Sequence, residues 1–212
     1  MSVQVRPVAP IEENMHTSAL KTAKLFFENY CNKQNLHIVE IGSQDVNGSL
    51  RQHAPTQCNY VGVDFSKGKG VDVVLTDPYK FPFEDNTFDV LMTSSCLEHS
   101  AMFWLSFLEG IRILKPNGLL YCNVPSNGME YHKYPIDCWR FFPDAAIGLE
   151  SWAKYNGYNT TVLETYVTRP TFINQDDYVS DWVGIFLKDS NYSNLHTNRI
   201  KHLDSIYLAG LV

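Results

Sequence analysis

A short apolar segment at residues 37–41 runs directly into a loop that begins at Gly42 and continues to Gly48. A second apolar segment, residues 60–64, ends in an acidic residue. This order predicts a buried strand, a turn into a short helix, and a second parallel strand. A glycine in such a turn lets the backbone approach a ligand closely, and the acid can accept hydrogen bonds from ribose hydroxyls. The pattern therefore predicts a nucleoside-binding site.

Strand-like and helix-like segments alternate through the rest of the chain, which predicts a mostly parallel sheet with helices on both faces. Apolar residues three or four apart mark the helices, and short apolar runs mark the strands. The last two strands have no obvious helix between them, which predicts a hairpin at one edge of the sheet. The expected helices cover residues 17–32, 48–53, 101–114, 144–155 and 198–211. The expected strands cover residues 37–41, 60–64, 71–75, 88–94, 119–124, 160–167 and 182–187.

The length and the charge of the chain limit its class. A chain of 212 residues fits one domain with a sizeable core, and we expect a single domain over residues 1–212. Within it, residues 1–13 are expected to be a flexible arm and residues 189–212 a C-terminal extension. The hydrophobic content of 44% indicates a globular protein rather than a disordered one. The net charge of -6 and the lack of a Lys/Arg run argue against a nucleic-acid partner.

The cysteines and the N-terminal segment indicate in which cellular compartment the protein is expected. Five cysteines occur without a C-x-x-C pair, so neither a zinc site nor a disulfide framework is expected. Such thiols are typical of a reducing compartment. Residues 1–10 lack the apolar core of a signal peptide, and no apolar run approaches the length of a membrane span. We therefore expect a cytoplasmic protein without a membrane span.

The glycines of the first loop also restrict the ligand. A dinucleotide-binding loop has the pattern G-x-G-x-x-G, because its second glycine admits a pyrophosphate. Here Gly42 is followed by Ser43 and Gln44, and the next glycine is Gly48. The chain also lacks the G-x-x-x-x-G-K-[ST] pattern of a P-loop. A nucleoside without phosphates therefore fits better than a dinucleotide, which disfavours an NAD-type oxidoreductase.

Several motifs occur in order along the chain. Residues 40–48 form the glycine loop, residues 81–89 read F-P-F-E-D-N-T-F-D, residues 97–99 read L-E-H, and residues 113–119 contain a Pro-Asn-Gly turn. From about residue 36 to residue 144, this series resembles the class I S-adenosylmethionine (SAM)-dependent methyltransferases, and within them the type 11 group. The resemblance implies a Rossmann-like, doubly wound α/β fold. Its mostly parallel, seven-stranded sheet would have the order 3-2-1-4-5-7-6, with helices on both faces.

The resemblance also implies the cofactor SAM and the residues that hold it. Asp64 matches the acid that binds the ribose, and Asp77 falls where the family places a contact to the adenine amino group. The alternative for Asp77 is a simple turn before Pro78. The implied cofactor-binding residues are Glu40, Gly42, Ser43, Gln44, Gly48, Asp64, Phe65, Asp77 and Ser94.

Two departures from related patterns bear on this assignment. Ser43, Gln44 and Asp45 stand where the family usually has small residues, so the bulkier loop could shift the cofactor or close over its carboxylate. Residues 77–79 also approach the Asp-Pro-Pro-Tyr motif of amino-methyltransferases. Only one proline is present, however, and the segment follows the third strand instead of the fourth, which argues against methylation of a base amino group.

The segment 127–142 follows the fifth strand and is expected to hang over the active site. Its aromatic residues, mixed with a few polar groups, suit a ring-bearing acceptor such as a sugar or an aromatic molecule. His132 is the first candidate for a general base, with Asp137 as its orienter, and His99 is the second candidate. Structural alternatives are a loop anchor for His99 and a buried ion pair between Asp137 and Arg140. The aromatic rings of Trp139 and Phe141 are expected to belong to the core.

Together these features predict a SAM-dependent methyltransferase that transfers a methyl group to a small-molecule or glycan acceptor, at a hydroxyl. A hydroxyl needs a base as the new bond forms, whereas a neutral amine or a carboxylate does not. The alternative is a non-catalytic SAM-binding or partner-binding domain of the same fold, because a fold does not determine a function. His132 and Asp137 alone make a weak case for a metal, so no metal is expected.

Overall fold

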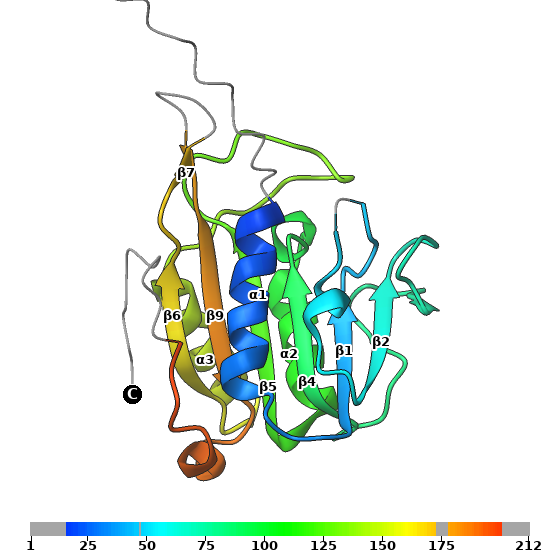
Figure 1. Ribbon diagram of the computed structural model, residues 1–212, viewed down its shortest axis with the longest axis vertical. Helices are drawn as coiled ribbons and strands as arrows, with labels where there is room; N and C mark the ends of the chain where they lie inside the picture. Colours follow the sequence, from blue (N-terminus) through cyan, green and yellow to red (C-terminus); the bar gives the residue numbers. More distant parts are fainter. Residues whose placement is uncertain (1–15, 47, 173–177, 201–212) are drawn as a thin grey trace, which may run out of the picture.

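The computed structural model describes residues 16–46, 48–172 and 178–200 (Figure 1). The arm expected at residues 1–13 lies outside these ranges, as does nearly all of the helix expected at residues 198–211. None of the described helices combines the length and the apolar character that crossing a membrane requires. The helices are α1 (His16–Tyr30), α2 (Phe103–Ile113) and α3 (Asp144–Tyr155), with short 3-10 helices η1 (Leu50–His53), η2 (Leu97–His99) and η3 (Ser190–Leu195). The strands are β1 (Leu36–Ile41), β2 (Cys58–Asp64), β3 (Val73–Val74), β4 (Phe88–Ser94), β5 (Leu114–Pro125), β6 (Thr161–Val167), β7 (Thr171–Phe172), β8 (Tyr178–Val179) and β9 (Asp181–Leu187).

A seven-stranded sheet in the order β3-β2-β1-β4-β5-β9-β6 forms the centre of the molecule. The first five strands of this order are parallel to one another. Strand β9 runs antiparallel to both β5 and β6, which makes β6 and β9 the expected pair at the edge. Because β9 is the seventh strand of this sheet along the chain, the predicted order 3-2-1-4-5-7-6 is confirmed. The small sheet of β7 and β8 was not predicted.

The two faces of the sheet bury alternate residues of each strand, because successive side chains of a strand point to opposite sides. On β1, Ile38 packs into a cluster that contains Phe26 of α1. The next residue, Val39, packs into a cluster that contains Phe107 of α2 and Leu149 of α3. Figure 1 shows α1 in front of the sheet and α2 and α3 behind it. Helices therefore cover both faces, as predicted.

The junction between α2 and β5 differs slightly from the expectation. The helix ends at Ile113, next to the predicted stop, but the strand begins at Leu114 instead of residue 119. Lys188 holds this junction, since its Nζ donates to the carbonyl oxygens of Arg112 at 2.9 Å and of Leu114 at 2.5 Å. A cation beside the last carbonyls of a helix offsets their partial negative charge.

The parallel strands end at one edge of the sheet, and the strand order reverses there between β1 and β4. Strand β1 pairs with β2 on one side and with β4 on the other. The segments that leave β1 and β4 therefore diverge and open a crevice, which is where ligands bind in open α/β sheets. Gly42 follows β1, and Ser95 follows β4.

Candidate functional site

A cavity of about 1090 Å³ opens at this edge of the sheet. Its walls come from the loop 42–48, the ends of β2 and β4, and the segment 128–136 that follows β5. Pockets for a single drug-sized ligand measure about 300–1,000 Å³, so this cavity has room for a nucleoside and a second molecule beside it. Of the residues predicted for the site, Asp77 and Asp137 do not line it. Those that do are Glu40, Gly42, Ser43, Gln44, Gly48, Asp64, Phe65, Ser94, His99 and His132.

Asp64 lies in the cavity wall at the end of β2 and is 5% exposed. One carboxylate oxygen accepts the backbone N–H of Gln44 at 3.1 Å, and the other accepts that of Ser66 at 3.2 Å. These two donors orient the carboxylate and join the loop after β1 to the turn after β2. Each carboxylate oxygen has a further lone pair for a ligand hydroxyl.

Gly42 brings the first loop against the end of β4. Its φ is +79°, a conformation that side-chain-bearing residues rarely adopt. A Cβ atom at this position would lie 2.6 Å from Cβ of Cys96 and 2.7 Å from its Sγ. The close approach that the sequence predicts for this glycine therefore includes a contact within the protein, in addition to its place in the cavity wall.

The unusual residues after Gly42 tie the loop to its surroundings. The side-chain oxygen of Gln44 accepts hydrogen bonds from Ser66 Oγ at 3.0 Å and from the hydroxyl of Tyr134 at 3.1 Å. Asp45 forms an ion pair with Lys69 at 2.6 Å. The bulky loop thus contacts both the turn after β2 and the segment above the cavity.

The remaining predicted cofactor residues occupy different positions around the cavity. Phe65 is 51% exposed, and its ring lies 6.3 Å from that of Tyr134 across the opening. Ser94 lies at the end of β4 and donates to Asn123 Oδ1 at 3.3 Å. Asp77 is exposed, and its carboxylate accepts the backbone N–H of Tyr79 at 2.8 Å, as in a simple turn.

Glu40 is a buried acid at the end of the cavity formed by β1 and β2. It is 5% exposed and accepts a hydrogen bond from the Tyr60 hydroxyl at 2.8 Å. Burial raises the pKa of Glu40 to about 7. The carboxyl of Glu40 therefore holds a proton in the folded state at pH values where the unfolded chain has already lost it.

This difference predicts a pH-dependent stability for the ligand-free protein. The contribution of Glu40 is fully present below its ordinary pKa of 4.5 and is lost as the pH rises through about 7. We expect the stability of Glu40→Gln relative to the wild type to increase by about 3 kcal/mol between pH 4.5 and pH 8. Urea unfolding at several pH values measures this difference. The exposed acid Glu84 provides a control, and wild-type and Glu40→Gln curves that stay parallel would contradict the prediction.

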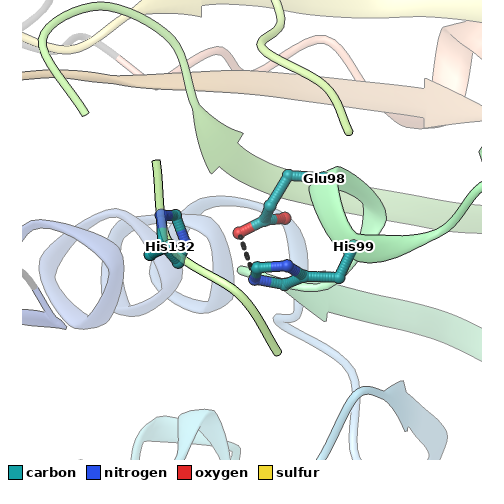
Figure 2. Close-up of side chains that lie close together, drawn as sticks. All are labelled: Glu98, His99 and His132. Carbon is teal, nitrogen blue, oxygen red and sulfur yellow. Dashed lines mark ion pairs between the residues drawn. The ribbon is translucent and has the colours of Figure 1, made fainter. Parts of the chain in front are cut away.

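The other end of the cavity holds two histidines and a buried acid. Figure 2 shows Glu98 and His99 leaving η2, with His132 facing them from the segment after β5. The rings of His99 and His132 lie 5.0 Å apart, edge to face. Glu98 is fully buried, and its Oε1 lies 3.7 Å from His99 Nε2. Burial lowers the pKa of His99, which favours its neutral ring.

Asp137 and Arg140 clamp the segment that carries His132. Arg140 donates to the two carboxylate oxygens of Asp137 at 2.5 and 2.8 Å, and to the carbonyl oxygen of Glu130 at 3.0 Å. Asp137 also accepts the backbone N–H of His132 at 2.8 Å and lies 3.6 Å from its Nδ1. The Arg140 guanidinium holds the pKa of Asp137 well below its usual range. The pair is thus a structural clamp that also positions His132.

The aromatic residues of this segment divide between core and cavity. Phe141 is 3% exposed and stacks on Trp182 at 5.5 Å, so its assignment to the core is confirmed. Trp139 is 37% exposed, so its assignment to the core is wrong. It packs at the surface on Phe103 at 5.4 Å and donates from Nε1 to the carbonyl oxygen of Ser100 at 2.9 Å. Tyr131 and Tyr134 line the cavity.

Sequence reasoning gave little weight to two acids of the cavity. Glu98 belongs to the L-E-H motif of residues 97–99, which contributes to the sequence prediction only through the family resemblance. Its position directly after the fourth strand is the signal that could have identified it. Asp181 begins β9, is 8% exposed and accepts a hydrogen bond from Ser18 Oγ at 2.6 Å. No local pattern around Asp181 indicates that it reaches the cavity.

One region of the sequence matches a model of a known protein family. Residues 39–122 match a family model described as a methyltransferase domain. The matched region begins in β1 and ends in β5, so it includes Gly42, Asp64 and the η2 residues Glu98 and His99. A comparison with curated protein sequences gives no match.

Solved structures share the fold at low sequence identity. The 1,6-didemethyltoxoflavin-N1-methyltransferase of Burkholderia thailandensis, bound to S-adenosylhomocysteine, has a TM-score of 0.62 and 13% identity, with 89% of this chain and 94% of that chain covered. A methyltransferase in complex with the Haloferax volcanii Trm112 activator has a TM-score of 0.60 and 17% identity, with 84% and 93% covered. The [4+2]-cyclase SpnF has a TM-score of 0.59 and 14% identity, with 84% of each chain covered.

Proposed function

We propose that the chain is a class I SAM-dependent methyltransferase, and that it transfers the methyl group of SAM to a hydroxyl of a small molecule or a glycan. One observation carries the proposal. A single cavity joins an oriented acid of the ribose-binding type, Asp64, to a pair of histidines, His99 and His132. The first end suits the cofactor, and the second suits an acceptor that must lose a proton.

The cofactor would lie along the first loop and the end of β2. Asp64 would accept the ribose hydroxyls, while Gly42 and Gln44 would line the path toward the methionine part. The apolar wall of Leu75 and Pro78 would contact the adenine, with Asp77 in the turn that shapes this wall. The remaining proposed contacts are Glu40, Ser43, Gly48, Phe65 and Ser94.

The acceptor would enter beside the segment 128–136. Tyr131 and Tyr134 offer aromatic faces, and Glu130 and Lys133 offer charged groups along the same wall. This mixture suits a polyhydroxylated or ring-bearing molecule. His99 and His132 would activate the acceptor hydroxyl, and Asp137 would orient His132. The protein would otherwise act by holding the acceptor oxygen in line with the sulfur–methyl bond and by excluding water.

Ligand-dependent melting tests the cofactor part of this proposal. SAM and S-adenosylhomocysteine should raise the melting temperature by binding the folded state, whereas NAD should not. Labelled SAM, incubated with cell-extract fractions that contain sugars, lipids or small phenolics, then tests transfer. Label in a hydroxylated fraction supports the proposal. Binding of SAM without transfer to any fraction would favour a non-catalytic domain.

Replacing His132 by alanine should lower kcat by roughly 100-fold or more, because acid–base assistance contributes about 10²- to 10⁴-fold. The affinity for SAM should change less than about twofold, since His132 lies at the acceptor end. His53 in η1 does not line the cavity, so His53→Ala is the matched control. Steady-state kinetics and calorimetry measure both quantities. Full turnover by His132→Ala would remove this residue from the mechanism.

A further inference from the structure

Glu98 is a buried carboxyl group that has no hydrogen-bond partner among the described residues. Its residue is 0% exposed, and neither side-chain oxygen has a hydrogen-bond partner within the described part of the chain. Burying an unpaired carboxylate costs several kcal/mol, which is why buried acids are paired, protonated or bound to a metal. The site therefore favours a positive partner for this group.

The two neighbouring histidines both present a free nitrogen. His99 Nδ1 lies 2.5 Å from the carbonyl oxygen of Ile136, and His132 Nδ1 lies 3.0 Å from that of Glu130. A carbonyl oxygen only accepts hydrogen bonds, so each Nδ1 must carry the proton. A histidine ring with its only proton on Nδ1 has its lone pair on Nε2. Metal-binding histidines have this arrangement, with one ring nitrogen donating to a carbonyl and the other binding the ion.

The three side chains meet at one point of the cavity wall. Each offers one ligand atom, and these atoms lie within 4.8 Å of one another. Ligand atoms on one zinc ion lie roughly 3–4 Å apart, given bonds of about 2.0–2.2 Å. Figure 2 shows the carboxylate of Glu98 directed toward the rings, which come from two different segments. Small rotations of His132, on the segment after β5, would close the remaining gap.

We propose that Glu98, His99 and His132 bind a divalent transition-metal ion of the Zn²⁺ type. Two imidazoles and one carboxylate favour such an ion over Mg²⁺ or Ca²⁺, which prefer oxygen ligands. Three protein ligands leave at least one coordination position open, as in catalytic zinc sites. That position faces the cavity at the end assigned to the acceptor.

The role of the ion rests on the proposed methyl transfer. An acceptor hydroxyl bound at the open position becomes more acidic and loses its proton to solvent. The oxygen then attacks the methyl carbon of SAM, and the carbon–sulfur bond breaks with its electron pair left on sulfur. The products are a methyl ether and S-adenosylhomocysteine. The two histidines would thus activate the hydroxyl through the metal.

Cobalt binding to the full, untagged chain tests the site without SAM or an acceptor. After treatment with a chelator, addition of Co²⁺ should produce visible absorption bands at a one-to-one ratio. Addition of Zn²⁺ should remove these bands, and Mg²⁺ should not. His132→Ala and Glu98→Gln should each weaken cobalt binding at least tenfold, whereas His53→Ala should leave it unchanged. Glu98→Gln keeps the shape of the buried side chain, so it should disturb the fold little. His132 is half-buried, so replacing it should not affect the packing of the core.

The outcomes separate the metal site from the methyl transfer. If Co²⁺ gives no bands, or binds His132→Ala as tightly as wild type, a proton shared between Glu98 and His99 replaces the metal and the inference is overturned. Methyl transfer that persists in such metal-free protein would leave the proposed function intact. Cobalt bands that depend on Glu98 and His132, with no methyl transfer to any acceptor, would support the site and count against the proposed function.

Discussion

Replacing Asp64 by alanine should weaken SAM binding by roughly 10- to 100-fold. A hydrogen bond to a charged group contributes about 1.5–3 kcal/mol, and each 1.4 kcal/mol corresponds to about a factor of ten in affinity. The Asp64 carboxylate is buried and already oriented by the backbone N–H groups of Gln44 and Ser66. A ribose would therefore meet a fixed acceptor and not a mobile one. Isothermal titration with SAM and with S-adenosylhomocysteine measures the loss.

The same substitution also removes a partner from two backbone donors, so a matched control is needed. Asp189 likewise accepts a backbone N–H, from Asn191 at 3.0 Å, and it does not line the cavity. Asp189→Ala should keep the wild-type affinity for SAM. Asp64→Asn should fall between wild type and Asp64→Ala, because the amide keeps one acceptor oxygen. SAM affinity of Asp64→Ala within twofold of wild type would rule out the ribose contact.

Replacing Gly42 by alanine should destabilise the protein by about 2–5 kcal/mol. The left-handed conformation costs a residue with a Cβ atom about 1–2 kcal/mol, and forcing an extra carbon into a packed site costs about 1–3 kcal/mol more. The clash is with Cβ of Cys96, 2.6 Å away, which is attached to the backbone and cannot rotate aside. The loop must then shift, and because Gly42 lines the cavity, SAM affinity should fall as well. Urea unfolding and titration with SAM measure the two effects.

Gly148 provides the contrasting case. It lies within α3, and a Cβ atom placed there would have no other atom within 4 Å. Gly148→Ala should therefore stabilise the protein by about 0.5–1 kcal/mol, since alanine is a better helix former than glycine. If Gly42→Ala and Gly148→Ala have equal stability, the packing of the first loop against the end of β4 is not as described.

The sequence predicts the layers of the fold well, because burial on both faces leaves a regular pattern in strands and helices. The order of the seven strands came from the family resemblance. The predicted strand 71–75 shortens to Val73–Val74, which pairs only with the end of β2. Asp72 instead uses its carboxylate to accept the backbone N–H of Gly62 at 2.7 Å. The two-residue strands β7 and β8 are too short to give an apolar pattern.

The candidate site could be predicted less completely than the fold, because part of it depends on contacts between segments far apart in the sequence. The ends of β1 and β2 can be recognised because ligand-binding residues follow parallel strands directly. The motif locates Glu98 in the sequence, but its burial depends on a distant segment that packs beside it. The backbone N–H groups of Cys138 and Trp139 donate to the main-chain carbonyl oxygen of Glu98 at 2.8 and 3.2 Å. The approach of His132 to His99 likewise depends on how the segment after β5 folds back.

The hydrogen bond between Tyr134 and Gln44 joins the two ends of the cavity. Tyr134 belongs to the segment beside the proposed acceptor site, and Gln44 belongs to the loop beside the proposed cofactor site. Because of this hydrogen bond, a ligand that moves or fixes one segment also changes the free energy of fixing the other segment in place. By thermodynamic reciprocity, whatever factor the cofactor adds to the affinity for the acceptor, the acceptor adds to the affinity for the cofactor. A favourable coupling between the two sites would make the spent cofactor easier to release once the methylated product has left.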